Sequence, residues 1–310
     1  MNRFSFFCLF VLVISCSKNE KELITLGFEK DLIPEGITTD PQTQTIYLNS
    51  LRHSKIVKCN VDGSKPSDFI TSGQYNYLPG FGMTIKGDTL FALGNSLPKH
   101  NSKSILLLLN KNTGAFIKSY TPSDTTFKYL NDLVVCKNGD IYITDSENNK
   151  IYTIQHDKDS LEVFLDTEEV KNSNGITASD DGKYLYIASM RVGIRIVDIS
   201  TKKIINEQNL DYTVIDGMKY YKNSLIAVRE LKDDKGVFRF FLSEDGTSII
   251  RKEKIISYDE NLQSPTTFSI MDGYIYVVVN TQIGNFNDQT NQIIDEGKLK
   301  TYQIMKFKIE

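Results

Sequence analysis

Four segments of the chain carry an oxygen-bearing side chain at the same point of a recurring pattern. Each segment comes just before an apolar run, a polar turn and a second apolar run. The segments are Pro34-Glu35-Gly36-Ile37, Leu130-Asn131-Asp132-Leu133, Ser173-Asn174-Gly175-Ile176 and Ile215-Asp216-Gly217-Met218. If the units close into a ring, two carboxylates and two amides meet at its centre. Oxygen atoms of this kind are the ligands that hard divalent cations prefer, so the pattern predicts a metal site.

The individual motifs also have a simpler interpretation. Asn-Gly and Asp-Gly pairs are common turn signals, so Asn174-Gly175 and Asp216-Gly217 alone would indicate turns. Their phase favours the metal site, because the other units place Glu35 and Asn131 at the same point. Two carboxylates crowded at an axis repel each other, and a bound cation removes that cost. All-oxygen ligation favours Ca²⁺, with Mg²⁺, Mn²⁺ or Zn²⁺ as alternatives.

The units that must position these side chains recur every ~40 to 50 residues, the period of propeller blades. Six units begin near Pro34, Pro79, Leu130, Ser173, Ile215 and Ser264. The third unit predicts strands over residues 132–136, 141–144, 150–155 and 161–164, with a hairpin turn at 137–140. One such sheet cannot bury both of its faces, so the units must pack against one another. We therefore expect an all-β, six-bladed β-propeller with a central divalent-metal site over residues 23–310. Residues 23–28 would close the ring as the outer strand of blade six.

In antiparallel blades, the start of the first strand and the loop between strands two and three lie on one face. The loops on that face carry His53 and Arg229. We expect both side chains to contact a substrate, and Arg229 in particular to bind a carboxylate or phosphate group. A solvated histidine and an ion-paired arginine are the simpler alternatives.

The first residues are typical of an exported bacterial protein. Residues 1–15 have a weakly basic start and an apolar run, and they end in Val13-Ile14-Ser15 before Cys16. This resembles a lipobox, so we expect a lipoprotein signal peptide over 1–15, lipidation of Cys16 and a polar tether over 16–22. An ordinary secretory signal with an incidental Cys16 is the alternative. Ser17 is not the Asp of an inner-membrane retention signal, which by resemblance places the protein at the outer membrane of the cell envelope. Lipid chains would then be its only membrane contact.

Composition narrows the function classes. The chain has 310 residues, 40% apolar content and a net charge of −3, without a basic run that would favour nucleic-acid binding. No G-x-S-x-G, H-E-x-x-H or P-loop motif is present, which argues against serine hydrolases, zincins and nucleotide enzymes. Cys59 and Cys136 fall in different units, where two isolated buried thiols or one disulfide are both open. We expect a monomer that binds a small molecule.

The ordered motifs resemble the senescence-marker-protein, gluconolactonase and regucalcin superfamily of six-bladed propellers. They are Pro34-Glu35-Gly36, Asn131-Asp132, Asn174-Gly175 and Asp216-Gly217-Met218. The resemblance implies that Glu35, Asn174 and Asp216 bind the metal and that Asn131 faces metal or substrate. Sugar-lactone members carry an Arg where this chain has Tyr129, so Tyr129 is the expected substrate contact at that position.

Two functions follow from this resemblance as expectations. The first is a Ca²⁺-dependent lactonase or esterase, in which the cation polarises the substrate carbonyl and Asp216 is both ligand and catalytic base. The second is a non-catalytic, lipid-anchored propeller that binds a small ligand, glycan or protein around a structural cation.

Overall fold

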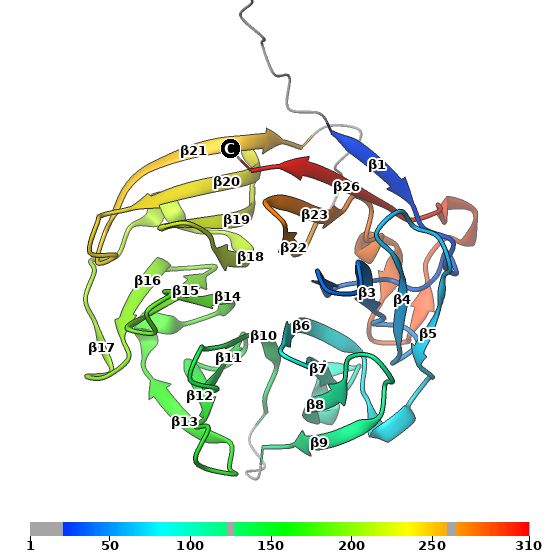
Figure 1. Ribbon diagram of the computed structural model, residues 1–310, viewed down its shortest axis with the longest axis horizontal. Helices are drawn as coiled ribbons and strands as arrows, with labels where there is room; N and C mark the ends of the chain where they lie inside the picture. Colours follow the sequence, from blue (N-terminus) through cyan, green and yellow to red (C-terminus); the bar gives the residue numbers. More distant parts are fainter. Residues whose placement is uncertain (1–20, 123–126, 259–264, 310) are drawn as a thin grey trace, which may run out of the picture.

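The computed structural model describes residues 21–122, 127–258 and 265–309. In them, six four-stranded antiparallel sheets surround a central axis (Figure 1). The predicted six-bladed β-propeller is therefore confirmed. The predicted signal peptide over 1–15, the lipidation site Cys16 and most of the tether over 16–22 lie outside the described residues. No described helix is long and apolar enough to cross a membrane.

The blades follow one another along the chain. Blade one contains β2 (Ile37–Asp40), β3 (Thr45–Asn49), β4 (Ile56–Asn60) and β5 (Ser67–Ile70), and blade two contains β6 (Gly80–Lys86), β7 (Thr89–Asn95), β8 (Ser104–Asn110) and β9 (Phe116–Tyr120). Blade three contains β10 (Leu130–Val135), β11 (Ile141–Asp145), β12 (Lys150–Ile154) and β13 (Glu162–Asp166). Blade four contains β14 (Ser173–Ala178), β15 (Tyr184–Ser189), β16 (Gly193–Asp198) and β17 (Lys203–Ile204). Blade five contains β18 (Ile215–Tyr220), β19 (Ser224–Leu231), β20 (Asp234–Leu242) and β21 (Ile249–Ser257).

Blade six closes the ring with strands from both ends of the described chain. It contains β22 (Phe268–Met271), β23 (Tyr274–Val278) and β26 (Gln303–Lys308), with β1 (Glu22–Thr25) as its outer strand. β1 pairs antiparallel with β26, from Glu22 opposite Lys306 to Thr25 opposite Gln303. The predicted closure of the ring by the first strand is confirmed, and Figure 1 shows β1 beside β26.

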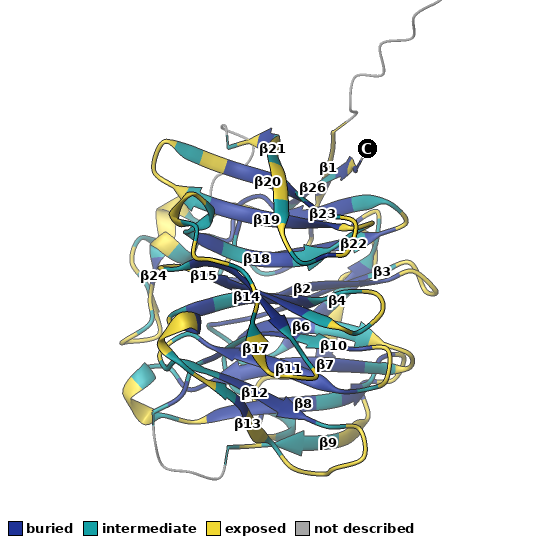
Figure 2. Ribbon diagram, turned by 90° about the vertical axis from the view of Figure 1, so that its left-hand side faces the viewer, coloured by how far each residue is buried: buried dark blue, intermediate teal, exposed yellow. Residues whose placement is uncertain are grey.

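Alternating side chains hold the blades together. In β11, Ile141 and Ile143 pack in the cluster shared with blade two, whereas Tyr142 packs in the cluster shared with blade four. Because successive strand residues point to opposite faces, a strand buried on both faces must be apolar at nearly every position. Figure 2 shows the resulting buried strands throughout the ring, with exposed residues concentrated at the turns.

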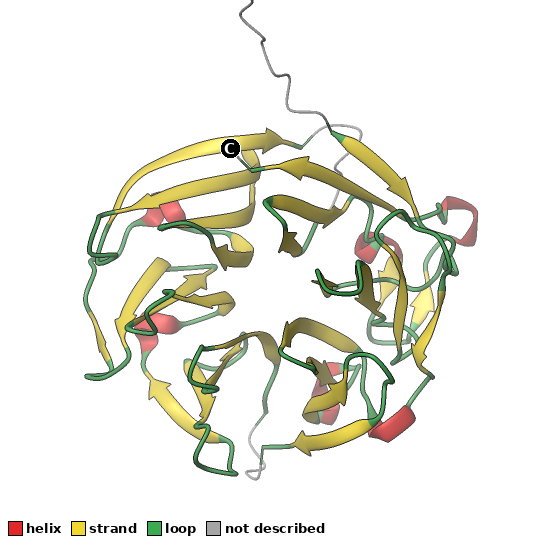
Figure 3. Ribbon diagram, in the orientation of Figure 1, coloured by secondary structure: helices red, strands yellow, loops and turns green. Residues whose placement is uncertain are grey.

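The connections are short, and helices are limited to three-residue 3₁₀ turns within the described ranges (Figure 3). These turns are Gln74–Asn76, Lys99–Asn101, Glu168–Val170, Leu210–Tyr212, Ile283–Asn285 and Glu296–Lys298. The β23–β26 connection is longer and contains a small hairpin of β24 (Phe286–Asn287) and β25 (Gln292–Ile293). Phe286 packs in the same apolar cluster as Ile33, Leu51 and Phe81.

Both cysteines within the described residues are buried and free. Cys59 packs in the cluster between blades six and one, and Cys136 packs in the cluster between blades three and four. Burial raises the pKa of both thiols, to about 12 for Cys59 and about 11 for Cys136. Of the two states that the sequence left open, the structure has the isolated buried thiols.

Candidate metal centre

A repeated irregularity of the inner strands sets the direction of the predicted ligands. In β6, β10, β14 and β18 the pairing with the next strand contains one extra residue near the strand start. The interrupted steps run between Gly80 and Met83, Leu130 and Leu133, Ser173 and Ile176, and Ile215 and Met218. A bulge of this kind bends the strand and redirects a side chain. Asn131, Asn174 and Asp216 therefore hold equivalent positions in three successive blades, and Phe81 holds the corresponding position in blade two.

Glu35 reaches the corresponding point of blade one from the segment before β2. Gly36 N donates to Asn49 Oδ1 at 2.7 Å, and the hydroxyl of Thr266 donates to the carbonyl oxygen of Glu35 at 2.8 Å. A Cβ at Gly36 would overlap the carbonyl oxygen of Phe81, so only glycine allows this approach between blades one and two. The Pro-Glu-Gly motif thus fixes Glu35 beside its neighbours in the ring.

The same close approach occurs on the other side of the ring. Gly217 N donates to the carbonyl oxygen of Thr266 at 2.9 Å, and a Cβ at Gly217 would overlap Thr267. Blade six therefore contacts blade five through Gly217 and blade one through Glu35. The Asp-Gly pair that could have been a turn lies instead within an inner strand, β18.

The electrostatics of Glu35 and Asp216 show that the two carboxyl groups share one environment. Both residues are half-buried, and loss of hydration is the largest cause that raises their pKa values. The charges of Asp216 and Asp132 raise the pKa of Glu35 further, while Lys219 lowers it. For Asp216, Glu230 adds to the rise, a hydrogen bond from Asn174 opposes it, and the pKa reaches about 8. Without a compensating cation, both groups favour their protonated forms.

This environment fits an oxygen-ligated cation. Glu35 and Asp216 would supply carboxylate oxygens, and Asn174, whose amide lowers the pKa of Asp216, would supply an amide oxygen. Asn131 holds the equivalent bulge position in the neighbouring blade. Across 21–122, 127–258 and 265–309, no three His, Cys, Asp or Glu side chains form a metal-type cluster. Amide and backbone oxygens must therefore complete any coordination, which favours Ca²⁺, Mg²⁺ or Mn²⁺ over zinc.

Asp132 is adjacent to this set but is already paired. Lys219 Nζ lies 3.3 Å from Asp132 Oδ2, and Leu133 N donates to Asp132 Oδ1 at 2.9 Å. Lys219 also lines a channel of about 340 Å³ that is formed by residues of all six inner strands, among them Thr38, Thr84, Leu133, Ile176 and Ser269. The Asp132–Lys219 pair thus lies where this channel approaches the carboxyl groups.

Two further side chains of the site were missed by sequence reasoning. Glu230, near the end of β19, has its pKa raised by burial, and its charge acts on Asp216. Tyr258 follows the outer strand β21, and burial together with the charges of Glu230 and Asp216 raises its pKa. The position of Glu230 next to Arg229, in a segment expected on the ligand-bearing face, could have indicated it. No local signal points to Tyr258, because an outer strand is expected far from the axis.

The structure places the predicted substrate contacts in different surroundings. Tyr129 lies near the ring: its aromatic ring meets Phe81 edge-on at 4.8 Å, Lys99 Nζ lies 4.3 Å from its centroid, and the charge of Glu35 adds to burial in raising its pKa. His53, in the β3–β4 connection, has its Nε2 3.2 Å from Asp31 Oδ2. The structure therefore brings Tyr129 to the site and leaves His53 beside Asp31.

Arg229 requires a correction. Its side chain is 1% exposed, and its guanidinium donates to the backbone oxygens of Thr213 and Asp211 at 3.1 and 2.9 Å and to the Asp234 carboxylate. It also lies 5.6 Å from the Phe238 ring centroid. The strand β19 is longer than the sequence indicated, so Arg229 belongs to its buried part and not to an open loop. It is a structural arginine, with its donors engaged inside blade five.

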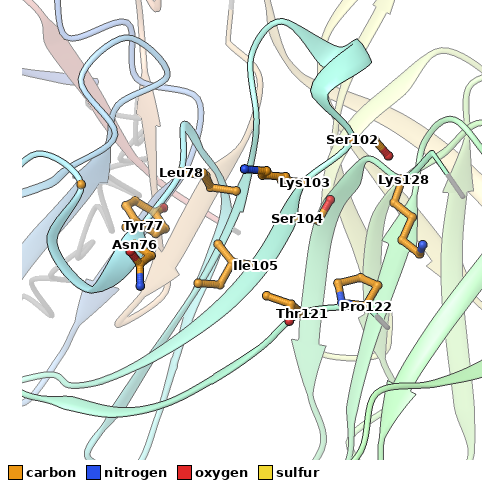
Figure 4. Close-up of a pocket in the computed structure, with 11 residues that line it drawn as sticks. Asn76, Tyr77, Leu78, Ser102, Lys103, Ser104, Ile105, Thr121, Pro122 and Lys128 are labelled. Carbon is orange, nitrogen blue, oxygen red and sulfur yellow. The ribbon is translucent and has the colours of Figure 1, made fainter. Parts of the chain in front are cut away.

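A cavity of about 520 Å³ lies away from the starts of the inner strands, in blade two and the connection that follows it. Figure 4 shows its lining, with Lys103 and Ile105 from β8 and its flank and Lys128 from the chain before β10. None of the predicted ligand or substrate residues lines it. The cavity is therefore separate from the candidate metal site, which is formed at the starts of the inner strands.

Comparison with known proteins identifies the family. Residues 33–220 match the family model described as the SMP-30/gluconolactonase/LRE-like region, so the chain belongs to this family. This confirms the resemblance that the ordered motifs indicated. A comparison with curated protein sequences gives no match.

Solved structures share the fold at low sequence identity. A gluconolactonase from Xanthomonas campestris aligns with a TM-score of 0.62 and 13% identity, over 93% of this chain and 90% of that one. A luciferin-regenerating enzyme aligns with a TM-score of 0.62 and 14% identity, over 94% and 96%. Virginiamycin B lyase from Staphylococcus aureus aligns with a TM-score of 0.60 and 14% identity, over 94% and 100%. Because these proteins have different activities, the likeness establishes the propeller and leaves the chemistry to the site.

Proposed function

We propose that the protein is a metal-dependent hydrolase of lactone- or ester-type small molecules. Membership of the gluconolactonase-like family supports this class of reaction. The observation that carries the proposal is the convergence of Glu35, Asn174 and Asp216, with two carboxyl groups whose pKa values are raised by loss of hydration and by neighbouring carboxylates. Placing two carboxyl groups where they lose hydration destabilises a fold unless a cation compensates them, so a cation site explains the arrangement better than a turn does.

Each residue has a defined part in this proposal. A divalent cation held there would polarise the substrate carbonyl and offset the charge that develops on its oxygen. Glu35, Asn174 and Asp216 hold the cation, and Asn131 faces it or the substrate. A bound cation would keep Asp216 ionised, and in that form Asp216 accepts a proton from the attacking water. Tyr129 lines the site towards blades two and three and contacts the substrate.

The proposal is tested by comparing wild type with Asp216→Ala. Bound metal is measured by elemental analysis, and hydrolysis is measured on a panel of lactones and aryl esters. We expect the variant to lose both bound Ca²⁺ and turnover. Asp180→Ala is the matched control, because Asp180 is an exposed carboxylate in the predicted β14–β15 turn. Full metal-dependent turnover in Asp216→Ala would disprove the assignment.

A second candidate is a non-catalytic propeller that binds a ligand around a structural cation. The observation that favours it is the loss of an expected substrate contact, since Arg229 is engaged in the core of blade five. Under this alternative, Ca²⁺ raises the melting temperature of the wild type while no lactone, aryl ester or phosphotriester is hydrolysed. Turnover of any of these substrate classes excludes it.

We also propose Ca²⁺ as the native cation and the outer membrane of a bacterial cell envelope as the location, with Cys16 lipidated. The all-oxygen ligand set supports the first proposal, and the lipobox-like Val13-Ile14-Ser15 before Cys16 supports the second. Metabolic labelling with a palmitate analogue in a bacterial host, compared between wild type and Cys16→Ser, tests the anchor. Equal labelling of the two proteins would contradict it.

A further inference from the structure

Tyr258 has a buried hydroxyl for which no hydrogen-bond partner exists in the part of the chain that the structure describes. Its aromatic ring packs against the apolar cluster between blades five and six, beside Ile256 and Phe268. A buried hydroxyl that donates to nothing is costly, and native structures retain few of them. The side chain is therefore held in place by packing while its polar end lacks a protein partner.

The hydroxyl lies within electrostatic range of the metal centre. The charges of Glu230 and Asp216 both act on it. Two carboxyl groups are therefore close by, yet Tyr258 donates to neither of them. Because the neighbouring charges and burial raise the pKa of Tyr258, the group stays a neutral phenol near neutral pH and keeps a hydrogen to donate.

We infer that Tyr258 donates its hydroxyl hydrogen to an oxygen of the ligand bound beside Asp216, namely the carbonyl oxygen of a lactone or ester. This inference rests on the proposed function and deepens it, because it defines the acceptor that the ligand must present. The proton stays on Tyr258, and its hydrogen bond strengthens as negative charge develops on the carbonyl oxygen. A donor fixed by packing and shielded from water is suited to this task, since it needs no reorganisation during the reaction.

A second tyrosine supplies a matched control. The hydroxyl of Tyr152, in β12 of blade three, is also buried and has no partner among the described residues. The charges that act on Tyr152 are those of Asp145 and Asp166, and neither belongs to the proposed ligand set. Each Tyr→Phe change deletes one unpartnered buried hydroxyl. The two variants differ in whether that hydroxyl lies near the proposed metal centre.

The experiment compares wild type, Tyr258→Phe and Tyr152→Phe in three measurements. The first is the melting temperature of the metal-free protein, which we expect to stay equal or to rise by about 2 °C in both variants. The second is calorimetric binding, in the presence of Ca²⁺, of a cyclic phosphonate that imitates the tetrahedral anion of lactone hydrolysis. The third is lactone turnover. We expect Tyr258→Phe to weaken phosphonate binding at least tenfold and to lower kcat about 100-fold, whereas Tyr152→Phe keeps wild-type values.

The outcomes separate this inference from the proposed function. Phosphonate binding that depends on Tyr258 without any lactone turnover leaves the inference intact and refutes the hydrolase. Turnover and phosphonate binding that are unchanged in Tyr258→Phe refute the inference and leave the hydrolase. A fall of several degrees in the melting temperature of metal-free Tyr258→Phe shows a structural hydrogen bond and also overturns the inference. Failure of the wild type to bind the phosphonate overturns it as well.

Discussion

At the scale of single residues, the two carboxyl groups of the ring determine the behaviour of the site. Glu35 and Asp216 are both half-buried, and the groups that lower their pKa values are Lys219 for Glu35 and the Asn174 amide for Asp216. Since Lys219 is also paired with Asp132, its charge is shared. Ionising both carboxyl groups would leave an excess of negative charge at the site, which a divalent cation is suited to neutralise.

The amide of Asn174 should contribute to the cation affinity in two ways. In the proposed site it would supply an oxygen and help to hold Asp216, so we expect Asn174→Ala to weaken Ca²⁺ binding by about 10- to 100-fold while the fold persists. Titration calorimetry with Ca²⁺ measures this change. Asn112→Ala, at an exposed turn of blade two, is the control. Unchanged affinity in Asn174→Ala would remove this residue from the ligand set.

The raised pKa of Asp216 predicts how stability responds to pH without metal. Between about pH 4 and pH 8 the folded protein keeps a proton that the unfolded chain has released, so unfolding releases a proton and stability falls as the pH rises. For each such proton, the unfolding free energy falls by at most about 1.4 kcal/mol per pH unit. In the proposed site Ca²⁺ would replace the proton, so its stabilising effect should grow over the same range.

Thermal melts in chelator and in Ca²⁺ check this expectation. They are recorded at about pH 5, 6.5 and 8, which span the window that the raised pKa defines. The metal-free melting temperature should fall towards pH 8 in the wild type, and the fall should be smaller in Asp216→Asn, which cannot ionise. If the metal-free wild type becomes more stable from pH 5 to pH 8 relative to this variant, the assignment of a raised pKa is wrong.

At the scale of the strands, asparagine side chains connect the inner strands of neighbouring blades. Asn49, at the end of β3, accepts from Gly36 N and donates to the carbonyl oxygen of Phe81. Asn95, at the end of β7, has the same relation to Leu130, accepting from its N–H at 2.9 Å and donating to its carbonyl oxygen at 2.7 Å. These bonds satisfy backbone groups that the bulged strand starts would otherwise leave unpaired.

Replacement of Asn49 should therefore destabilise the junction between blades one and two. Asn49→Ala leaves the Gly36 N–H and the Phe81 carbonyl without their partners, which we expect to cost about 2–3 kcal/mol of unfolding free energy. Chemical denaturation measures this loss. In the control Asn60→Ala, the amide bonds only to Ser64 in an exposed turn, and the loss should be below about 0.5 kcal/mol. Equal losses would show that the bridge is unimportant.

At the scale of the whole molecule, the ring depends on the strand that joins its two ends. β1 contributes Ile24 to the cluster between blades six and one, while its neighbour Leu23 points to solvent. Because a six-bladed ring buries each blade on both sides, an open junction would expose the apolar faces of two blades. The outer strand of blade six therefore stabilises far more of the chain than its own length suggests.

The contrast between Ile24 and Leu23 tests this closure. Ile24 is 4% exposed and Leu23 is 44% exposed. We expect Ile24→Ala to lower the unfolding free energy by about 2–4 kcal/mol through the cavity it leaves, and Leu23→Ala to change it by less than about 0.5 kcal/mol. Urea denaturation of the two variants measures the difference. Similar values for both would mean that β1 does not close the ring through its inward face.

The sequence by itself determined the blades, their order and the phase of the ligand positions. These properties follow from local signals: hairpin turns, alternating apolar residues and the recurrence of Glu35, Asn131, Asn174 and Asp216 at one point of each unit. Only the tertiary structure decided which side chains surround those positions. Tyr258, which follows the outer strand β21, lies within range of the charges of Glu230 and Asp216, while Arg229 lies in the core of blade five. The physical reason is that one extra residue in a strand or one longer strand redirects a side chain, and its neighbours are then set by packing between blades that are distant in sequence.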